Sequence, residues 1–206
     1  MSRKEAERCA ACSMKLALCV CAFRPTLHTR TRVVLLLHAT EAHKTTNTGR
    51  LAVGCLPNSR TVEVADGART SPVVEGEPDA LLLFPGADAR PLREVAQEPR
   101  RPVTLMVPDG TWRQARKMRT RVPGLALLPC VTLPDAPATA YRLRVEGREG
   151  GLSTLEAIAW ALELLEGPAV GEALRAFQRV FVERTLWSRG ALAADDVTGG
   201  IPPDAR

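Results

Sequence analysis

Three short, continuous apolar runs constrain what this chain can fold into more than any other feature of its sequence. They occupy residues 32–38, 80–84 and 103–107, and each ends at a polar residue or at a turn with proline and glycine. Uninterrupted apolar runs of this length are typical of strands buried on both faces, as in parallel sheets covered by helices. A shorter run at 61–64 predicts a further strand, at an edge of the sheet.

The rest of the chain predicts helices and a few weaker strands. Helices are predicted at 50–56, 111–121, 153–165 and 171–187, the last two separated by a Gly-Pro pair that stops a helix. Weaker strand patterns lie at 125–128, 131–133 and 141–144. We therefore expect an α/β domain with a mostly parallel sheet and helices on both faces, and a ligand site beyond the carboxyl ends of its strands.

Length, composition and charge narrow the class of protein. The 206 residues, 45% of them hydrophobic, suffice for one compact domain with a small appendage. No apolar run reaches the roughly 18 residues of a membrane span, and the charged N-terminus lacks the apolar core of a secretory signal, so we expect a cytoplasmic protein. The net charge of +5 modestly favours an acidic partner such as nucleic acid.

Four cysteines near the N-terminus need an explanation other than disulfides, which a cytoplasmic chain rarely carries. Cys9, Cys12, Cys19 and Cys21 lie in a segment without an apolar pattern of its own. They predict a structural zinc site, because zinc takes four sulfur ligands as a tetrahedron and its binding can fold a short segment. An iron–sulfur cluster, a set of free thiols and a redox pair are the alternatives, although a redox Cys-x-x-Cys would be expected to open a helix after a strand.

The loop after the run at 103–107 reads Asp109-Gly110-Thr111-Trp112, and it resembles the signature of the DTW-domain family. Further blocks fit that family in the same order along the chain: the cysteine cluster, His38-x-x-Glu41 with residues 46–51, residues 83–89, Tyr141-x-Leu143-Arg144, and residues 152–157. Together they span residues 9–187. Ala39 departs from the pattern, because proline would be expected after His38.

This resemblance implies a tRNA-uridine aminocarboxypropyltransferase. Such an enzyme moves the 3-amino-3-carboxypropyl group of S-adenosylmethionine to N3 of a uridine, expected in the variable loop, and releases 5'-methylthioadenosine. A SPOUT-like, knotted fold is implied as well, with tRNA as partner and no membrane; no obligate protein partner is inferred. The chain would divide into a zinc-binding appendage (1–30), the S-adenosylmethionine-binding DTW domain (31–189) and a C-terminal tail (190–206), which we expect to be loose.

The resemblance places catalysis at Asp109, Thr111 and Trp112. Asp109 is the first candidate for the base that removes the uridine N3 proton, since a carboxylate just past a buried strand can be partly desolvated. Capping the following helix is the alternative for Asp109 and for Thr111, which would otherwise orient the base or the substrate. Trp112 would stack on an RNA base or pack its helix against the sheet. His38 is the second candidate for the base.

Residues in three loops are expected to contact the donor. They are Phe84, Pro85, Gly86, Val107, Pro108, Leu152, Ser153, Thr154 and Glu156. The first five would offer backbone groups to adenine and ribose, whereas the hydroxyls and free helix amides of the last loop would hold the methionine carboxylate or ribose. The alternatives are plain turns and a helix cap, in which Glu156 would complete the cap rather than bind the donor's ammonium group.

Contacts with the substrate are assigned to two further groups of residues. They are His38, Glu41, Asn47 and Arg50 beyond the first strand, and Arg113, Arg116 and Lys117 on the helix after the signature. The second group forms a basic stripe, which we expect to meet RNA phosphates; a solvated helix face is the alternative.

Other classes of function stay open at this point. The first is a related S-adenosylmethionine enzyme, either a methyltransferase of the same fold or a transferase acting on ribosomal RNA. The second is a non-catalytic, zinc-bearing RNA-binding module. The third is redox chemistry at Cys9 and Cys12.

Overall fold

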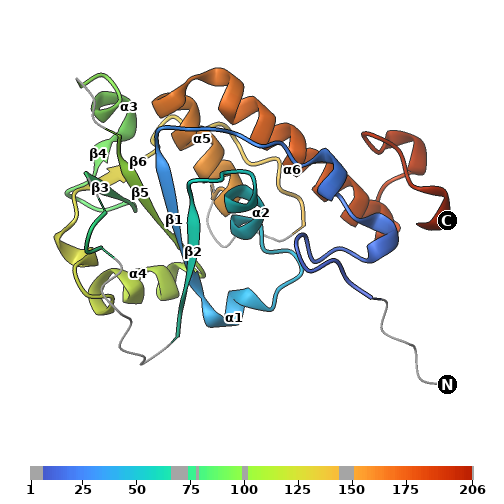
Figure 1. The fold of residues 1–206 in the computed structure, drawn as a ribbon, viewed down its shortest axis with the longest axis horizontal. Coiled ribbons are helices and arrows are strands. Elements are labelled where there is room, and N and C mark those ends of the chain that lie inside the picture. The colour runs from blue at the N-terminus through green and yellow to red at the C-terminus, as the bar shows by residue number, and fades with distance from the viewer. Residues whose placement is uncertain (1–6, 66–73, 78, 99–101, 144–150, 206) are drawn as a thin grey trace.

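A computed structural model describes residues 7–65, 74–77, 79–98, 102–143 and 151–205, and Figure 1 shows a central sheet with helices on both sides. Within these residues the sheet has six strands: β1 (Arg32–His38), β2 (Arg60–Val64), β3 (Ala80–Leu83), β4 (Arg90–Pro91), β5 (Thr104–Asp109) and β6 (Cys130–Thr132). The strands lie in the order β2-β1-β5-β3-β6-β4, and all their pairings are parallel. The expected mostly parallel α/β sheet is therefore confirmed.

Helices cover the two faces of the sheet unequally. The α-helices are α1 (Ala39–Ala42), α2 (Gly49–Gly54), α3 (Leu92–Val95), α4 (Trp112–Arg121), α5 (Thr154–Glu166) and α6 (Pro168–Ser188), and the short 3-10 helices are η1 (Leu16–Leu18), η2 (Cys21–Phe23), η3 (Leu125–Leu127), η4 (Ala194–Asp196) and η5 (Pro203–Ala205). Residues of α2, α3, α5 and α6 pack on one face, whereas α4 and η3 pack on the other.

Strand β1 shows why the sheet is buried on both sides. Leu35 and Leu37 join the larger core beneath α5 and α6, while Val34 and Leu36 join the core beneath α4. All four side chains are at most 3% exposed, and burying each contributes about 1.5–3 kcal/mol. The apolar run at 32–38 is thus continuous because alternate residues serve two different cores.

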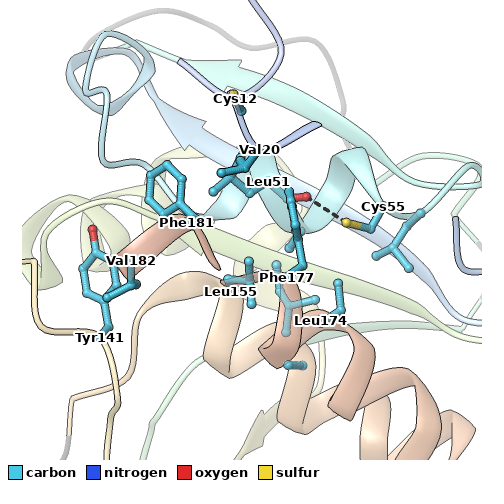
Figure 2. Packing of buried hydrophobic residues seen from close by; sticks show 14 of the residues in the cluster. Cys12, Val20, Leu51, Cys55, Tyr141, Leu155, Leu174, Phe177, Phe181 and Val182 are labelled. Atoms are coloured by element: carbon cyan, nitrogen blue, oxygen red, sulfur yellow. Dashed lines mark hydrogen bonds between the residues drawn. The ribbon is translucent and has the colours of Figure 1, made fainter. Parts of the chain in front are cut away.

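The cysteine-rich segment packs on the same core as the sheet. Figure 2 shows Val20 of this segment and Leu51 of α2 close to Phe181 of α6, and all three are buried in one cluster with Cys12. The described part of the appendage expected over residues 1–30 is therefore partly buried against the domain.

Most of the predicted elements are confirmed. The strands predicted at 32–38, 61–64, 80–84, 103–107 and 131–133 correspond to β1, β2, β3, β5 and β6, and the four predicted helices correspond to α2, α4, α5 and α6. Elements α1, β4 and α3 were not predicted, because two to four residues leave no readable periodicity. Among the described residues, no helix combines the length and apolar character needed to cross a membrane.

Three local predictions need correction. No strand forms at 125–128, because Gly124 turns the chain with φ +80° into η3, where Leu127 is 89% exposed. Residues 141–143 also lie outside any strand, and Arg144 falls outside the described residues. The tail is not loose over its described part, since Val197 and Ile201 are buried in the larger core.

Candidate active site

A cavity of about 720 Å³ opens at the carboxyl ends of β3, β5 and β6. This volume falls within the range of small-molecule sites. One wall is apolar and comes mainly from the strand ends; it includes Leu83, Phe84, Val107, Val131 and Leu133. The opposite wall is polar, and the loops before α2, α4 and α5 supply it. The cavity therefore lies beyond the carboxyl ends of the strands, where a ligand site was expected.

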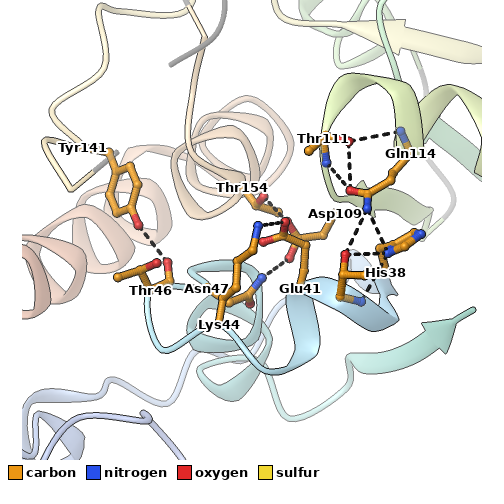
Figure 3. Close-up of polar contacts among 11 residues, drawn as sticks. His38, Glu41, Lys44, Thr46, Asn47, Asp109, Thr111, Gln114, Tyr141 and Thr154 are labelled. Atoms are coloured by element: carbon orange, nitrogen blue, oxygen red, sulfur yellow. Dashed lines mark hydrogen bonds and ion pairs between the residues drawn. The ribbon is translucent and has the colours of Figure 1, made fainter. Parts of the chain in front are cut away.

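Asp109 is the buried carboxylate of the polar wall. It ends β5 opposite Leu37 of β1 and is 6% exposed. Asn47 Nδ2 donates to Asp109 Oδ2 at 2.7 Å, and Thr154 Oγ1 donates to Asp109 Oδ1 at 2.6 Å. Figure 3 shows these two donors approaching from different elements. The carboxylate is thus held in one orientation by residues that were predicted to serve the substrate and the donor.

Close packing around the carboxylate depends on a residue without a side chain. A side-chain carbon at Gly49, the first residue of α2, would lie 2.5 Å from Asp109 Oδ2. Asn47 is itself fixed, because its Oδ1 accepts from the backbone N–H of Arg50 at 3.1 Å. The loop from α1 to α2 therefore places the Asn47 amide against Asp109, and Gly49 leaves the space that this contact needs.

Two capping boxes orient the helices that begin at the cavity. Thr111 accepts from the Gln114 N–H at the start of α4, and Ser153 accepts from the Glu156 N–H at the start of α5. Each N3 side chain returns a bond to the cap residue's backbone. Thr111 and Ser153 line the cavity, but their hydroxyls accept from the Gln114 and Glu156 N–H groups in the caps.

Glu156 takes the capping role that was the alternative for it. It is absent from the cavity wall, and its two carboxylate oxygens accept from Ser153 N–H, Thr139 Oγ1 and Ala140 N–H at 2.7–2.8 Å. This carboxylate ties residues 139–140 to the start of α5. The geometry of Glu156 therefore favours the cap over a direct contact with the donor's ammonium group.

His38 lies outside the cavity wall. It is 3% exposed, and its Nδ1 lies 2.9 Å from Thr40 Oγ1 and 3.1 Å from Gln114 Nε2. This network, visible in Figure 3, joins the end of β1 to α4. His38 is thus placed to fix the loops beside Asp109 rather than to meet a ligand.

Four polar residues complete the far side of the cavity. Glu41, 2% exposed, forms an ion pair with Lys44, and Tyr141 donates from its hydroxyl to the Thr46 carbonyl at 2.7 Å. All four line the cavity. Only Glu41 had been assigned to the site; Tyr141 belongs to one of the family blocks and is the chain's single tyrosine, a signal that would have singled it out.

The remaining predicted donor contacts divide into two sets. Pro85, Pro108 and Leu152 line the cavity together with Phe84 and Val107. Gly86 does not, because it faces Asp88 and Arg119; a side-chain carbon there would meet Asp88 Oδ1 at 2.7 Å.

The predicted basic contacts also separate. Arg50 points away from the cavity, and its guanidinium donates to Ser13 Oγ at 3.2 Å in the cysteine-rich segment. Arg113 and Arg116 are exposed on α4, and Lys117 is half-buried. None of these lines the main cavity, while Trp112, 42% exposed, stands at its rim with its ring in edge contact with Phe84.

The four N-terminal cysteines come together as predicted for a metal site. All four Sγ atoms lie within 4.8 Å of one another, with Cys9–Cys21 at 3.6 Å and Cys12–Cys19 at 3.7 Å. The backbone N–H groups of Cys12 and Ala11 lower the pKa of Cys9 to about 6, whereas burial raises the pKa of Cys12. Cys55 and Cys130, expected to be ordinary core residues, are both buried.

A buried arginine of α6 packs beside this cluster. Arg184 is 3% exposed, donates to the Cys19 carbonyl at 2.8 Å and the Gly200 carbonyl at 3.1 Å, and lies 4.9 Å from the Phe23 ring centroid. Its Nε has no hydrogen-bond partner, and it forms no ion pair with a carboxylate among the described residues. The cluster therefore lies next to a buried positive charge.

Comparison with known proteins relates this geometry to a family. The DTW domain model matches residues 6–186. The chain is 32% identical over 175 residues to tRNA-uridine aminocarboxypropyltransferase 2 of Macaca fascicularis, covering 79% of this chain and 58% of the relative. It is 31% identical over 172 residues to the protein of the same name from Drosophila melanogaster, covering 77% and 66%. The chain thus spans less than two thirds of the length of either relative.

A solved structure shares the fold. The SAM-dependent rRNA:acp-transferase Tsr3 from Vulcanisaeta distributa matches with a TM-score of 0.50 and 20% identity, over 85% of this chain and 87% of that one. The family model covers nearly the whole chain and includes the Asp109 loop, the cavity and the cysteine cluster. This chain belongs to the DTW-domain family.

Proposed function

We propose that this chain transfers the 3-amino-3-carboxypropyl group of S-adenosylmethionine to N3 of a tRNA uridine and releases 5'-methylthioadenosine. The observation that carries the proposal is the buried Asp109 carboxylate, oriented by two donors inside a ligand-sized cavity. Membership of the DTW-domain family and the names of the relatives support the same reaction.

The lining of the cavity suits the donor in polarity and in charge. S-adenosylmethionine supplies an electrophilic methylene carbon next to a sulfonium. Phe84, Val107 and Leu152 offer an apolar wall for its adenine, while Asp109 and Glu41 are acids on the polar wall that favour a cationic ligand. Pro85 and Pro108 would lie beside the nucleoside part, and Thr154 beside the amino-acid part.

Asp109 would remove the proton from uridine N3. A carboxylate oxygen can accept more than one hydrogen bond, so the contacts from Asn47 and Thr154 do not by themselves prevent Asp109 from taking a proton. Asn47 and Thr154 would hold the carboxylate in line with the acceptor, and orientation of this kind supplies a large part of many enzymatic accelerations. Thr111 would act through the cap that orients α4, and Trp112 would cover the entrance.

The by-product of the donor tests the proposed reaction class. The protein is incubated with S-adenosylmethionine and tRNA, and the released nucleoside is identified by liquid chromatography. Release of 5'-methylthioadenosine that depends on tRNA supports aminocarboxypropyl transfer. S-adenosylhomocysteine would instead show methyl transfer, and no tRNA-dependent release would favour a binding module without catalysis.

We propose that the cysteine cluster binds structural zinc. Sulfur atoms 2.3 Å from zinc in a tetrahedron are about 3.8 Å apart, close to the 3.6 and 3.7 Å of the two measured pairs. Four thiolates around zinc carry a net negative charge, which the buried Arg184 would partly balance. One zinc per chain by elemental analysis, lost when Cys12 is replaced by serine, tests this proposal; iron with visible absorbance would indicate an iron–sulfur cluster.

Finer features of the account are proposals as well. We propose a SPOUT-like fold with a knotted donor site, as the family resemblance implies, and the division into appendage, DTW domain and tail. The target uridine is proposed to lie in the variable loop. A cytoplasmic location is proposed as well, because it fits a tRNA substrate. A structure with the donor bound would trace the chain around the cavity.

A further inference from the structure

A second, smaller cavity adjoins the first on the side of α4. It has a volume of about 430 Å³ and is lined by Phe84, Pro85, Trp112, Arg116, Arg119, Thr120 and Ala126. The first three of these residues also line the main cavity. The two cavities therefore share one wall, and a molecule that extends past Trp112 would occupy both.

The two cavities differ in charge. The main cavity has two acids, Asp109 and Glu41, against one base, Lys44. The seven residues that line the second cavity include two arginines and no acid. A cationic donor and a polyanionic acceptor would thus be drawn to different sides of the shared wall.

The two arginines of the second cavity have different tasks. Arg119 is fixed, since its guanidinium bonds Asp88 at 3.0 Å and lies 5.7 Å from the Phe84 ring centroid. Arg116 is exposed and makes no hydrogen bond or ion pair to any residue that the structure describes. Arg119 therefore stabilises the wall, whereas the Arg116 charge is available to a phosphate.

Trp112 presents an aromatic surface at the junction. It is 42% exposed and is one of four exposed large hydrophobic residues among the described residues. Its ring meets the Phe84 ring at a centroid distance of 6.4 Å and 66° between planes. A uridine drawn out of its RNA stack leaves the face of the neighbouring base uncovered. An aromatic ring can replace that lost stacking without regard to the identity of the base.

We propose that the second cavity binds the nucleotide adjacent to the target uridine, with its base against Trp112 and its phosphate at Arg116. The RNA then enters across α4, and the donor lies on the acidic side of the Phe84–Trp112 wall. This inference rests on the proposed function and adds the route of the RNA. It also gives Trp112 a role in positioning the substrate rather than in the chemical step.

The test measures tRNA binding by fluorescence anisotropy over a range of salt concentrations. Arg116→Gln should weaken binding and lower the slope of log Kd against log salt by about one, the value of a single phosphate contact. Arg179→Gln is the matched control, because Arg179 is an exposed arginine of α6 on the opposite side of the sheet; it should leave the slope unchanged. Equal slopes for both variants and the wild type would overturn the assignment of Arg116.

Substitutions of Trp112 test the stacking contact. Trp112→Ala should weaken tRNA binding by about 5- to 150-fold, as expected for one lost base–aromatic stack, while Trp112→Phe should retain most of the affinity. Equal losses in both variants, or none, would overturn the stacking role. Wild-type protein that binds tRNA but releases no 5'-methylthioadenosine would contradict the proposed function. The binding results for the Arg116 and Trp112 variants would still test the proposed nucleotide site.

Discussion

Replacing Asp109 by asparagine separates the chemistry of the carboxylate from its structural role. The asparagine Oδ1 can still accept from Asn47 Nδ2, and its Nδ2 can donate to Thr154 Oγ1, because a hydroxyl both donates and accepts. Both contacts of the polar wall are therefore kept. What disappears is the negative charge and the capacity to take a proton.

The expected losses differ in size. Two hydrogen bonds to a charged group become bonds between neutral groups, which lowers stability by about 1 kcal/mol each. The variant no longer buries a charge at this 6% exposed site, and this gain offsets part of the loss. Unfolding free energy should thus fall by roughly 0–2 kcal/mol. Loss of a general base typically lowers the rate about 10²–10⁴-fold, equivalent to about 3–5 kcal/mol of transition-state stabilisation.

Single-turnover formation of 5'-methylthioadenosine, at saturating donor and tRNA, measures this rate directly. Denaturant unfolding of the same samples measures stability. Thr154→Val keeps the base but removes one of its orienting donors and should lower the rate about tenfold, and Asp195→Asn, at an exposed position of the tail, should match the wild type. The reasoning is refuted if Asp109→Asn turns over within threefold of the wild type.

The site, the metal cluster and the ion pairs give three further predictions. Gly49→Ala should destabilise the fold by about 1–3 kcal/mol and lower turnover, because its added carbon would lie 2.5 Å from Asp109 Oδ2; circular dichroism melting and the turnover assay check this, and an unchanged variant would contradict it. Chelation of zinc should lower the melting temperature of the wild type but not of Cys12→Ser, and equal shifts would argue against the metal site. Burial raises the pKa of Glu77, but the hydrogen bonds from Arg60 and Thr104 and the positive charges of Arg32 and Arg60 lower it by more. The pKa of Glu77 is therefore below its ordinary value. The stability that Glu77 contributes is therefore present above the ordinary glutamate pKa and lost as pH falls through the lowered value, so Glu77→Gln should flatten the acid limb of stability measured by denaturant unfolding.

The sequence was informative where one local property decides the structure. The run at 32–38 is apolar throughout because both faces of β1 are buried, and the Asp109 loop lies at the cavity because parallel strands end at one edge of the sheet. The capping box of α5 was foreseen from its four-residue pattern, and a capping role for Thr111 at the start of α4 was foreseen as an alternative, without its partner Gln114. Such features depend on neighbours in the chain, which a sequence displays.

The partners of Asp109 depend on contacts that no local pattern displays. Asn47 and Thr154 lie 62 and 45 residues from Asp109 in the chain. Their contacts follow from β1 pairing with β5 and from α5 packing over that pair. For the same reason Arg50, beside Asn47 in sequence, points to the cysteine-rich segment instead of the cavity. The catalytic, donor and substrate roles assigned to the site residues stay predictions.

The most direct test of the central claim is the mass of the modified nucleoside. Unmodified tRNA is incubated with the protein and S-adenosylmethionine, digested to nucleosides and analysed by mass spectrometry. The account predicts a uridine heavier by one aminocarboxypropyl group, formed in an amount equal to the released 5'-methylthioadenosine. A methylated base, or tRNA that binds but stays unmodified, would contradict it.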